Sequence, residues 1–218
     1  MQQRIGILGG TFNPIHYGHL AAAEEVRERL SLDSILFIPT ALPPHKQEAM
    51  PDAAHRMEMV RLAISGNPPF ELSDIEVKRG GRSYTIDTID ALRSSLPGAE
   101  LYFLTGVDSF HEIKSWHQWE RLLGRCAFVI LSRPGYPFSE LAAIDFMKHA
   151  AKDLDRLDRG EMREITMRTA TACLYLEKIP HYDISSTDIR ERIRDGRSVK
   201  YLLPEPVERY IITNTLYA

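Results

Sequence analysis

The chain has 218 residues, of which 44% are hydrophobic and 26% charged, as is usual for a soluble globular protein. Its 27 basic and 30 acidic residues give a net charge of −3, which argues against a broad nucleic-acid-binding surface. Two cysteines far apart in the sequence, Cys126 and Cys173, exclude a zinc pattern and indicate buried thiols in a reducing compartment. No apolar segment resembles a signal or membrane-spanning segment, so we expect a cytoplasmic protein that binds no membrane.

The first predicted strand, Arg4–Leu8, leads directly into a glycine-rich turn. Residues 9–19 are Gly-Gly-Thr-Phe-Asn-Pro-Ile-His-Tyr-Gly-His, and the apolar spacing that follows predicts a helix over 20–30. Because Gly9 and Gly10 have no Cβ, their backbone N–H groups can approach an anion closely. The helix that begins there directs its positive end at the same place. A strand-to-helix turn of this kind is a common ligand site in α/β sheets.

Two histidines in this turn are candidate catalytic residues. His16 and His19 are three residues apart, so they face the same side if Gly18 opens the helix. Their ring nitrogens can then donate hydrogen bonds to phosphate oxygens. For a glycine pair alone, an ordinary turn is about as good an explanation as an anion site, and a single histidine can be purely structural. The combination in one turn favours a site for a polyphosphate.

The next segment of the chain contains a stiff loop. Prolines 43 and 44 precede His45 and Lys46, which are either solvated loop residues or contacts to a phosphate or ribose. Asp52 is the expected N-cap of the helix after it. The elements predicted in this region are a strand over 34–38, a helix over 52–65 and a strand over 70–77.

Hydroxyl and aromatic residues precede the next predicted helix, over 86–95. Ser83 or Thr85 can cap it, and its N-terminus beside the Tyr84 ring could instead receive a carboxylate. Capping alone explains the serine and threonine, so the residues themselves leave both interpretations open.

A second glycine turn follows the predicted strand over 100–105. Asp108, two residues after Gly106, either caps the next helix or accepts hydrogen bonds from ribose hydroxyls. Trp116 either belongs to the core or lies flat on an aromatic ligand ring. Arg133 comes after the strand over 127–131, at the same edge of the sheet.

The region after that strand is harder to interpret. Apolar residues over 141–154 predict a helix, the polar stretch that follows has no clear pattern, and the last strand is expected over 174–178. We treat residues 139–171 as an insertion without assigned chemistry.

A second candidate anion site begins at Ile184. Ser185 and Ser186 are natural N-caps of a helix that ends near Gly196. Three successive hydroxyl residues, Ser185 to Thr187, with Arg190 one turn later suit the outer phosphates of a nucleotide. Residues 184–218 are expected to form a small C-terminal helical part.

These two motifs carry a family resemblance. Residues 9–19 are similar to the G-T-F-x-P-x-H-x-G-H signature of the nucleotidylyltransferase superfamily, and residues 184–190 resemble its I-S-S-T-x-I-R motif. Within the superfamily, the sequence most resembles the bacterial nicotinate mononucleotide adenylyltransferases, over nearly the whole chain. The segments Ser83–Thr85, Gly106-x-Asp108 and Trp116, and the sequence Arg-Pro-Gly at 133–135, belong to this branch.

The resemblance implies an α/β fold with a Rossmann-like doubly wound parallel sheet of strand order 3-2-1-4-5. The chain is expected to be a single domain, 1–218, that includes the C-terminal helical part. The implied activity is adenylyl transfer from ATP to nicotinate mononucleotide, which gives deamido-NAD and pyrophosphate in NAD synthesis. His16 and His19 are the implied catalytic pair, Mg²⁺ would be held mainly by the ATP phosphates, and no protein metal site is expected.

The resemblance also assigns binding residues. The implied ATP contacts are Gly9, Gly10, Thr11, Phe12, Gly106, Asp108, Ile184, Ser185, Ser186, Thr187 and Arg190. The implied contacts to nicotinate mononucleotide are Asn13, His45, Lys46, Ser83, Tyr84, Thr85, Trp116 and Arg133. Both partners are small molecules, and a homo-oligomer remains open.

Four alternatives fit the sequence less well. Phosphopantetheine adenylyltransferases share the first motif but lack the segments specific to the nicotinate branch, and cytidylyltransferases carry Asp where Asn13 stands. A non-catalytic nucleotide-binding module would be favoured by loss of a histidine or of the second motif, and both are intact. A dinucleotide-dependent oxidoreductase is disfavoured because the glycines do not form G-x-G-x-x-G.

Overall fold

A computed structural model of the chain describes residues 2–42, 50–169 and 171–218. Contacts group the chain into two compact units, one formed by residues 1–7 and 84–181 and the other by residues 8–83 and 182–218. The candidate residues His45 and Lys46 lie outside the described residues.

The strands form one mostly parallel sheet of order β3-β2-β1-β4-β5-β7-β6, and β1 (Arg4–Gly10) contributes residues to both units. The predicted order 3-2-1-4-5 is therefore present, and two further strands extend it. Of these, β7 is parallel to β5, whereas β6 runs antiparallel to β7. The α/β class with a Rossmann-like sheet is confirmed.

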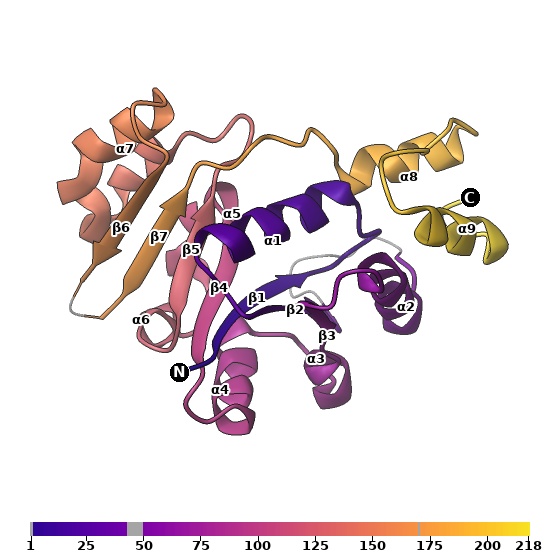
Figure 1. The fold of residues 1–218 in the computed structure, drawn as a ribbon, viewed down its shortest axis with the longest axis horizontal. Coiled ribbons are helices and arrows are strands. Elements are labelled where there is room, and N and C mark those ends of the chain that lie inside the picture. The colour runs from indigo at the N-terminus through magenta and orange to yellow at the C-terminus, as the bar shows by residue number, and fades with distance from the viewer. Residues whose placement is uncertain (1, 43–49, 170) are drawn as a thin grey trace. The chain divides into compact units, whose positions relative to one another are not determined.

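The unit of residues 8–83 and 182–218 is built around a buried strand. Every residue of β2 is buried, which explains the apolar run that follows its first residue, Ser34. Helix α9 packs on α2 (Figure 1), where the side chains of Met59, Val60, Val207 and Ile211 are at most 2% exposed. Apart from its part of β1, this unit contains α1 (Tyr17–Arg29), β2 (Ser34–Pro39), α2 (Ala53–Ile64), β3 (Phe70–Leu72), α3 (Ile75–Arg79), α8 (Ser186–Arg194) and α9 (Glu205–Thr213).

Two local predictions in this unit have opposite outcomes. Asp52 is the N-cap of α2, as expected, and its carboxylate accepts a hydrogen bond from the His55 backbone N–H at 3.0 Å. The predicted strand over 70–77 is wrong after Leu72, because Asp74 becomes the N-cap of the short helix α3. Gly80, with φ of 69°, ends that helix in a conformation that suits glycine.

The unit of residues 1–7 and 84–181 has a parallel strand core. Residues 4–7 of β1 pair with β4, which pairs with β5. Phe110 and Phe128 are fully buried and meet edge to face. Apart from its part of β1, this unit contains α4 (Thr85–Ser95), β4 (Glu100–Gly106), α5 (Val107–His111), η1 (Ile113–Ser115), α6 (Trp119–Leu123), β5 (Ala127–Leu131), η2 (Phe138–Ala143), η3 (Asp145–Ala150), α7 (Ala151–Asp158), β6 (Glu164–Arg168) and β7 (Cys173–Glu177).

At two helices, α4 and α5, the residues that could have capped the helix do not do so. The N-cap of α4 is Tyr84, so neither Ser83 nor Thr85 caps that helix. The N-cap of α5 is Gly106, and Asp108 lies inside its first turn. Both helices begin without a side-chain hydrogen bond at the cap, so these hydroxyl and carboxylate groups are not committed to capping.

The insertion has more regular structure than its sequence indicates. The single helix predicted over 141–154 is instead two 3-10 segments, η2 and η3, followed by α7. The polar stretch after α7 contains β6, in which the less exposed Ile165 and Met167 alternate with exposed residues. This alternation over two residues is the signature of an edge strand with one face in contact with the protein.

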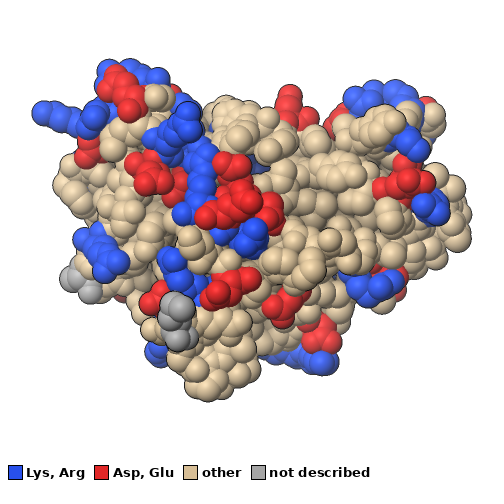
Figure 2. All heavy atoms as spheres, in the orientation of Figure 1, with Lys and Arg blue, Asp and Glu red and all other residues tan. Residues whose placement is uncertain are grey.

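The surface and the cysteines give further constraints. In the described parts of the chain, no helix is long and apolar enough to cross a bilayer. Basic and acidic side chains are interspersed on the face drawn in Figure 2. Both cysteines are free, and each residue is half-buried rather than buried as the sequence predicted. Desolvation raises the pKa of Cys126 to about 12, so this thiol stays protonated at neutral pH.

We predict that Asp158 stabilises the insertion. Its carboxylate accepts hydrogen bonds from the backbone N–H groups of Phe138 at 2.8 Å and Ser139 at 2.9 Å, joining the end of α7 to the start of η2. Asp158→Ala should lower the free energy of unfolding by about 1–3 kcal/mol, since two backbone donors lose their acceptor. Urea unfolding measures this, with the exposed Asp155→Ala on the same helix as control. Equal stability of the two variants would contradict the assignment.

Candidate functional site

The turn between β1 and α1 brings the two candidate histidines into contact. His16 is the N-cap of α1, and His19 is the third residue of that helix. They face the same side, as their spacing predicted, and their rings stack with centroids 3.7 Å apart and planes 30° apart. His16 is 6% exposed, whereas His19 is half-buried.

The proton position on His19 follows from a hydrogen bond. The backbone N–H of His16 donates to Nδ1 of His19 at 3.3 Å. A neutral imidazole accepts at one nitrogen and donates at the other, so Nε2 is the donor atom of His19 in this arrangement. This hydrogen bond is one of the two that make up a capping box between His16 and His19. The capping box fixes the His19 ring at the start of the helix.

Gly18 permits this close arrangement. A Cβ at this position would lie 3.0 Å from Nδ1 of His16 and 3.5 Å from the carbonyl oxygen of Ile184. The glycine therefore lets the helix start against both the histidine ring and the backbone of the second motif, in agreement with the role expected for it.

Phe12 supports the histidine pair from the other side. Its ring is buried, meets the His19 ring edge to face at 5.3 Å and lies 6.0 Å from the Phe37 ring. A Cβ on Gly10 would lie 3.3 Å from this ring, so packing of Phe12 already accounts for that glycine. Phe12 has φ of 47°, which is an unfavourable backbone conformation for a bulky residue. Strained conformations of this kind are common in functional loops.

The second motif is hydrogen-bonded to the first. The Ser185 hydroxyl accepts from the Asp188 backbone N–H at 3.0 Å and is thus the N-cap of α8. The Ser186 hydroxyl donates to the carbonyl of Pro14 at 2.8 Å, and Nη1 of Arg190 donates to the carbonyl of Asn13 at 2.9 Å. The structure therefore brings the two predicted motifs together within one unit.

Two residues that the sequence analysis missed also hold the first motif. Arg56 is 1% exposed and donates to the carbonyl of Thr11 at 2.9 Å. The Tyr217 hydroxyl donates to Oδ1 of Asn13 at 2.8 Å. A signal for Arg56 was present, because Arg56, Met59 and Val60 have the spacing of one helix face and the last two are apolar. Tyr217 lies about 200 residues from its partner, and no local pattern indicates such a contact.

Burial changes the proton affinity of both residues. Desolvation lowers the pKa of Arg56 from its ordinary value, although Tyr217 and Asp52 act in the opposite direction. Desolvation raises the pKa of Tyr217, and the charges of Arg190 and Arg56 oppose that shift only in part. Tyr217 is thus a neutral hydroxyl donor at physiological pH.

In the other unit, aromatic residues gather near the start of α4. The Tyr84 and His117 rings lie 4.4 Å apart at 34°. Trp116 is half-buried and meets the Phe103 ring edge to face at 6.0 Å, so only part of the indole belongs to the core. Trp119 is half-buried and stacks on the Phe146 ring at 6.2 Å.

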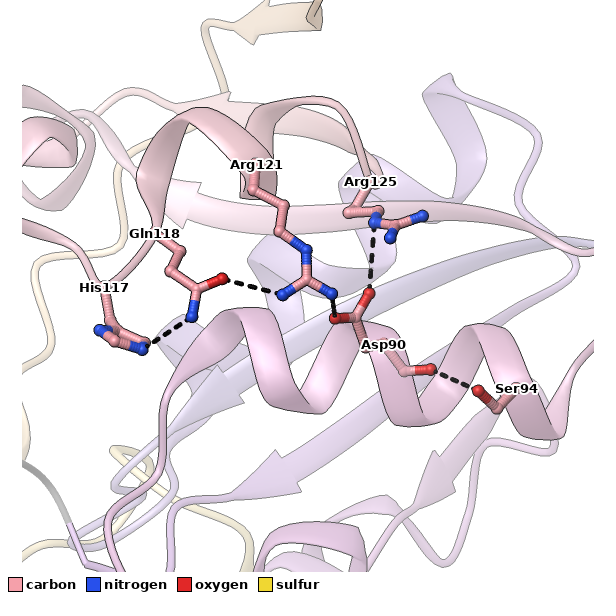
Figure 3. Close-up of polar contacts among 6 residues, drawn as sticks. All are labelled: Asp90, Ser94, His117, Gln118, Arg121 and Arg125. Carbon is pink, nitrogen blue, oxygen red and sulfur yellow. Dashed lines mark hydrogen bonds and ion pairs between the residues drawn. The ribbon is translucent and has the colours of Figure 1, made fainter.

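A network of polar side chains anchors this aromatic segment to α4, as Figure 3 shows. The His117 ring contacts the Gln118 amide at 3.1 Å, and Oε1 of Gln118 accepts from Arg121 at 2.8 Å. Arg121 and Arg125 in turn form ion pairs with Asp90 of α4. Helix α4 therefore holds both the segment that contains His117 and, at its own start, Tyr84.

Gly106, Asp108 and Arg133 come together after β4 and β5, as predicted. A Cβ on Gly106 would overlap Oδ1 of Asp108 and would lie 3.1 Å from Nε of Arg133. The Asp108 oxygen forms only a long ion pair with Arg133, at 3.5 Å, and accepts no hydrogen bond within the part of the chain that the structure describes. A buried carboxylate oxygen without a donor is an acceptor for ligand hydroxyl groups.

The donor set does not form a cage for a resident metal ion. Among the described residues, no group of three or more His, Cys, Asp and Glu side chains is arranged to hold one. A divalent cation in this protein would take most of its oxygen ligands from phosphate groups and water.

Comparisons with known proteins agree with these motifs. A family model described as cytidylyltransferase-like matches residues 7–192. A probable nicotinate-nucleotide adenylyltransferase of Geobacter metallireducens is 45% identical over 98% of each chain. One from Desulfitobacterium hafniense is 40% identical over 99% of this chain and 96% of its own. The structure of Plasmodium falciparum nicotinic acid mononucleotide adenylyltransferase complexed with NaAD has a TM-score of 0.74, with 21% identity over 99% of this chain and 98% of its own.

We predict that Gly18→Ala displaces the His16 ring without unfolding the helix. The added Cβ would lie 3.0 Å from Nδ1 of this ring, while alanine favours the helix by about 0.4–1 kcal/mol through the unfolded state. The imidazole proton resonances of His16 and His19 should therefore shift in NMR spectra, with the melting temperature nearly unchanged. Gly66→Ala is the control, because a Cβ there has no heavy atom within 4 Å. Unshifted imidazole resonances in Gly18→Ala would show that the rings are not packed as described.

Proposed function

The chain belongs to the cytidylyltransferase-like family and, within it, to the nicotinate-nucleotide adenylyltransferases, and we propose that it transfers the adenylyl group of ATP to nicotinate mononucleotide. The products are nicotinate adenine dinucleotide and pyrophosphate. The observation that carries this proposal is the stacked histidine pair at the N-terminus of α1, hydrogen-bonded through its loop to the second motif. The reaction involves small molecules only and takes place in the cytoplasm.

The chemical step in this proposal is a single in-line displacement. An oxygen of the mononucleotide 5′-phosphate attacks the α-phosphorus of ATP and forms the new P–O bond. The bond from that phosphorus to the oxygen bridging to the β-phosphate breaks, and its electron pair leaves with pyrophosphate. The protein contributes position and charge stabilisation rather than a covalent intermediate.

The histidine pair stabilises the charge that develops on the phosphates. Nε2 of His19 is the donor atom in the observed arrangement, and its hydrogen bond to a phosphate oxygen strengthens as negative charge moves to the leaving group. His16 binds the same phosphates from the N-cap position. Backbone N–H groups of the loop from Gly9 to Phe12 add donors without mobile side chains.

The second motif binds the outer phosphates in this proposal. Arg190 donates to the backbone carbonyl of Asn13 and to the Thr187 hydroxyl, and its guanidinium charge attracts a phosphate while the loop stays fixed. Thr187 adds a hydroxyl group, and the segment from Ile184 to Ser186 contributes its backbone at the start of α8.

The ribose of ATP is assigned to Asp108. Its buried carboxylate oxygen accepts no hydrogen bond in the described part of the protein, and ribose hydroxyls are donors of the right kind. The absence of a side chain on Gly106 keeps the space beside this oxygen open.

The mononucleotide is assigned to the aromatic segment and the N-terminus of α4. The backbone N–H groups of Tyr84 and Thr85 donate to the nicotinate carboxylate, and the half-buried Trp116 stacks on the pyridine ring. Arg133 pairs with a phosphate of this substrate. The remaining proposed contacts to it are Asn13, His45, Lys46 and Ser83.

Magnesium enters the proposal as part of the substrate. The ion arrives bound to the ATP phosphates and keeps water ligands, since among the described residues no group of three or more His, Cys, Asp and Glu side chains could hold it. Its charge neutralises the triphosphate, while the chain supplies the hydrogen-bond donors.

A pyrophosphate-release assay with ATP and a panel of acceptors tests the proposed function. Nicotinate mononucleotide should support turnover far better than nicotinamide mononucleotide or phosphopantetheine. Release with phosphopantetheine alone would replace the proposed acceptor, and tight ATP binding without release from any acceptor would indicate a non-catalytic module.

We predict that His19→Ala lowers kcat by about two to three powers of ten, the scale of losing one transition-state donor. The fold should persist, since the ring lies at the half-buried start of a helix. Steady-state assays measure kcat, circular dichroism checks the fold, and the exposed His111→Ala is the control. Turnover of His19→Ala within a few-fold of the wild type would remove this residue from the mechanism.

We predict a preference in kcat/KM for nicotinate over nicotinamide mononucleotide of about five- to a hundred-fold. The amide NH₂ of the latter would leave a buried N–H donor unpaired, at a cost of about 1–3 kcal/mol. Thr85→Pro removes the backbone N–H of Thr85, and proline is tolerated at this first helical position because the preceding Tyr84 is extended. The variant should therefore reduce the ratio of the kcat/KM values for the two mononucleotides. Thr85→Ala keeps the N–H and is the control. Trp116→Ala should weaken both substrates alike. Equal efficiency of the wild-type enzyme with both mononucleotides would rule out this acceptor site.

A further inference from the structure

The carbonyl groups of the loop from Thr11 to Pro14 are held by donors from distant parts of one unit. Arg56 donates to Thr11, Arg190 to Asn13 and Ser186 to Pro14, at 2.9, 2.9 and 2.8 Å. The last two donors belong to the second motif, whose residues the proposed function already uses. Arg56 does not belong to either motif.

Arg56 is placed to hold backbone. It lies in α2, is 1% exposed, and also donates to the carbonyls of Ala41 and Pro51, each at 3.2 Å. A buried guanidinium is tolerated only when its donors are satisfied, and in this case three carbonyl groups satisfy them. Movement of the Thr11 carbonyl would leave part of this buried charge without a partner.

Tyr217 holds the same loop through a side chain. Its hydroxyl donates to Oδ1 of Asn13 at 2.8 Å, and Asn13 is only 5% exposed. The backbone carbonyl of Asn13 is held by Arg190, so this residue is fixed at both its backbone and its side chain. Loss of the Tyr217 hydroxyl would leave a buried amide oxygen unsatisfied.

Fixing these carbonyls has a consequence for the N–H groups of the loop. In a trans peptide unit, the C=O of one residue and the N–H of the next point in opposite directions. With the carbonyls of Thr11 and Pro14 held toward Arg56 and Ser186, the N–H groups of Phe12 and Ile15 are turned to the opposite side. A carbonyl oxygen facing a phosphate would repel it, whereas an N–H group attracts it.

We infer that Arg56 and Tyr217 are positioning residues of the proposed adenylyl transfer, which hold the carbonyl side of the loop from Thr11 to Pro14. Neither residue contacts substrate. They act through the loop, whose N–H groups and adjoining His16 face the ATP phosphates. This inference rests on the proposed function.

Tyr217→Phe tests the inference most cleanly, because it removes one hydroxyl and keeps the ring. Tyr210→Phe is the matched control, since the Tyr210 hydroxyl forms a hydrogen bond of 2.9 Å with His55 in the same unit, away from the loop. We expect Tyr217→Phe to weaken MgATP binding in calorimetry and to lower kcat/KM for ATP by about tenfold, the scale of one buried hydrogen bond. The MgATP affinity and the kcat of Tyr210→Phe should not change.

Arg56→Lys adds a second test, because lysine keeps the charge but its single nitrogen cannot span three carbonyl groups. Arg61→Lys, on the exposed side of the same helix, is its control. We expect MgATP binding to weaken in Arg56→Lys only. If Arg56→Lys does not fold, Tyr217→Phe decides the question.

The outcomes separate this inference from the proposed function. MgATP affinity and kcat of Tyr217→Phe equal to those of Tyr210→Phe would overturn the positioning role. Equal loss of thermal stability with unequal MgATP affinity would support it, because a purely structural role changes both variants alike. A wild-type protein that releases no pyrophosphate with any acceptor would overturn the proposed function, and MgATP affinity would still test the loop.

Discussion

The loop from Thr11 to Pro14 has backbone carbonyl groups that must find hydrogen-bond donors inside the protein, directly before the histidine pair at the start of α1. Side chains from α2 and from α8 meet this requirement, and Tyr217, in the segment after α9, holds the side-chain amide oxygen of Asn13. The same constraint accounts for Gly18, since the helix that carries His19 must begin against the backbone of Ile184. The charged, buried Arg56 is the most demanding part of this arrangement, because its position depends on three carbonyl groups at once.

Much of the site was predictable because its residues are close in sequence or carry strong local patterns. The spacing of His16 and His19 predicts that both face the same side of the helix start, where their rings stack, and Ser185 is the N-cap that its residue type suggests. Gly106, Asp108 and Arg133 follow two neighbouring strands, so parallel pairing brings them together. The strand order 3-2-1-4-5 followed from the family resemblance.

The parts that could not be predicted depend on contacts between distant segments. Tyr217 meets Asn13 across 204 positions, and no local pattern encodes that pairing. The strand β6 is hidden by its polar composition, because one face of an edge strand is exposed to water. The predicted cap at Ser83 failed because its hydroxyl instead accepts a hydrogen bond from the backbone of Ala41 at 3.2 Å.

The central claim is that the chain binds and orients the reacting phosphates and forms no bond to them. The stereochemical course of transfer tests this claim most directly, with ATP that carries sulfur in one configuration on its α-phosphorus. A single in-line attack by the mononucleotide phosphate predicts inversion at that phosphorus in the dinucleotide product. Retention would require two successive displacements through an adenylylated side chain and would contradict the account.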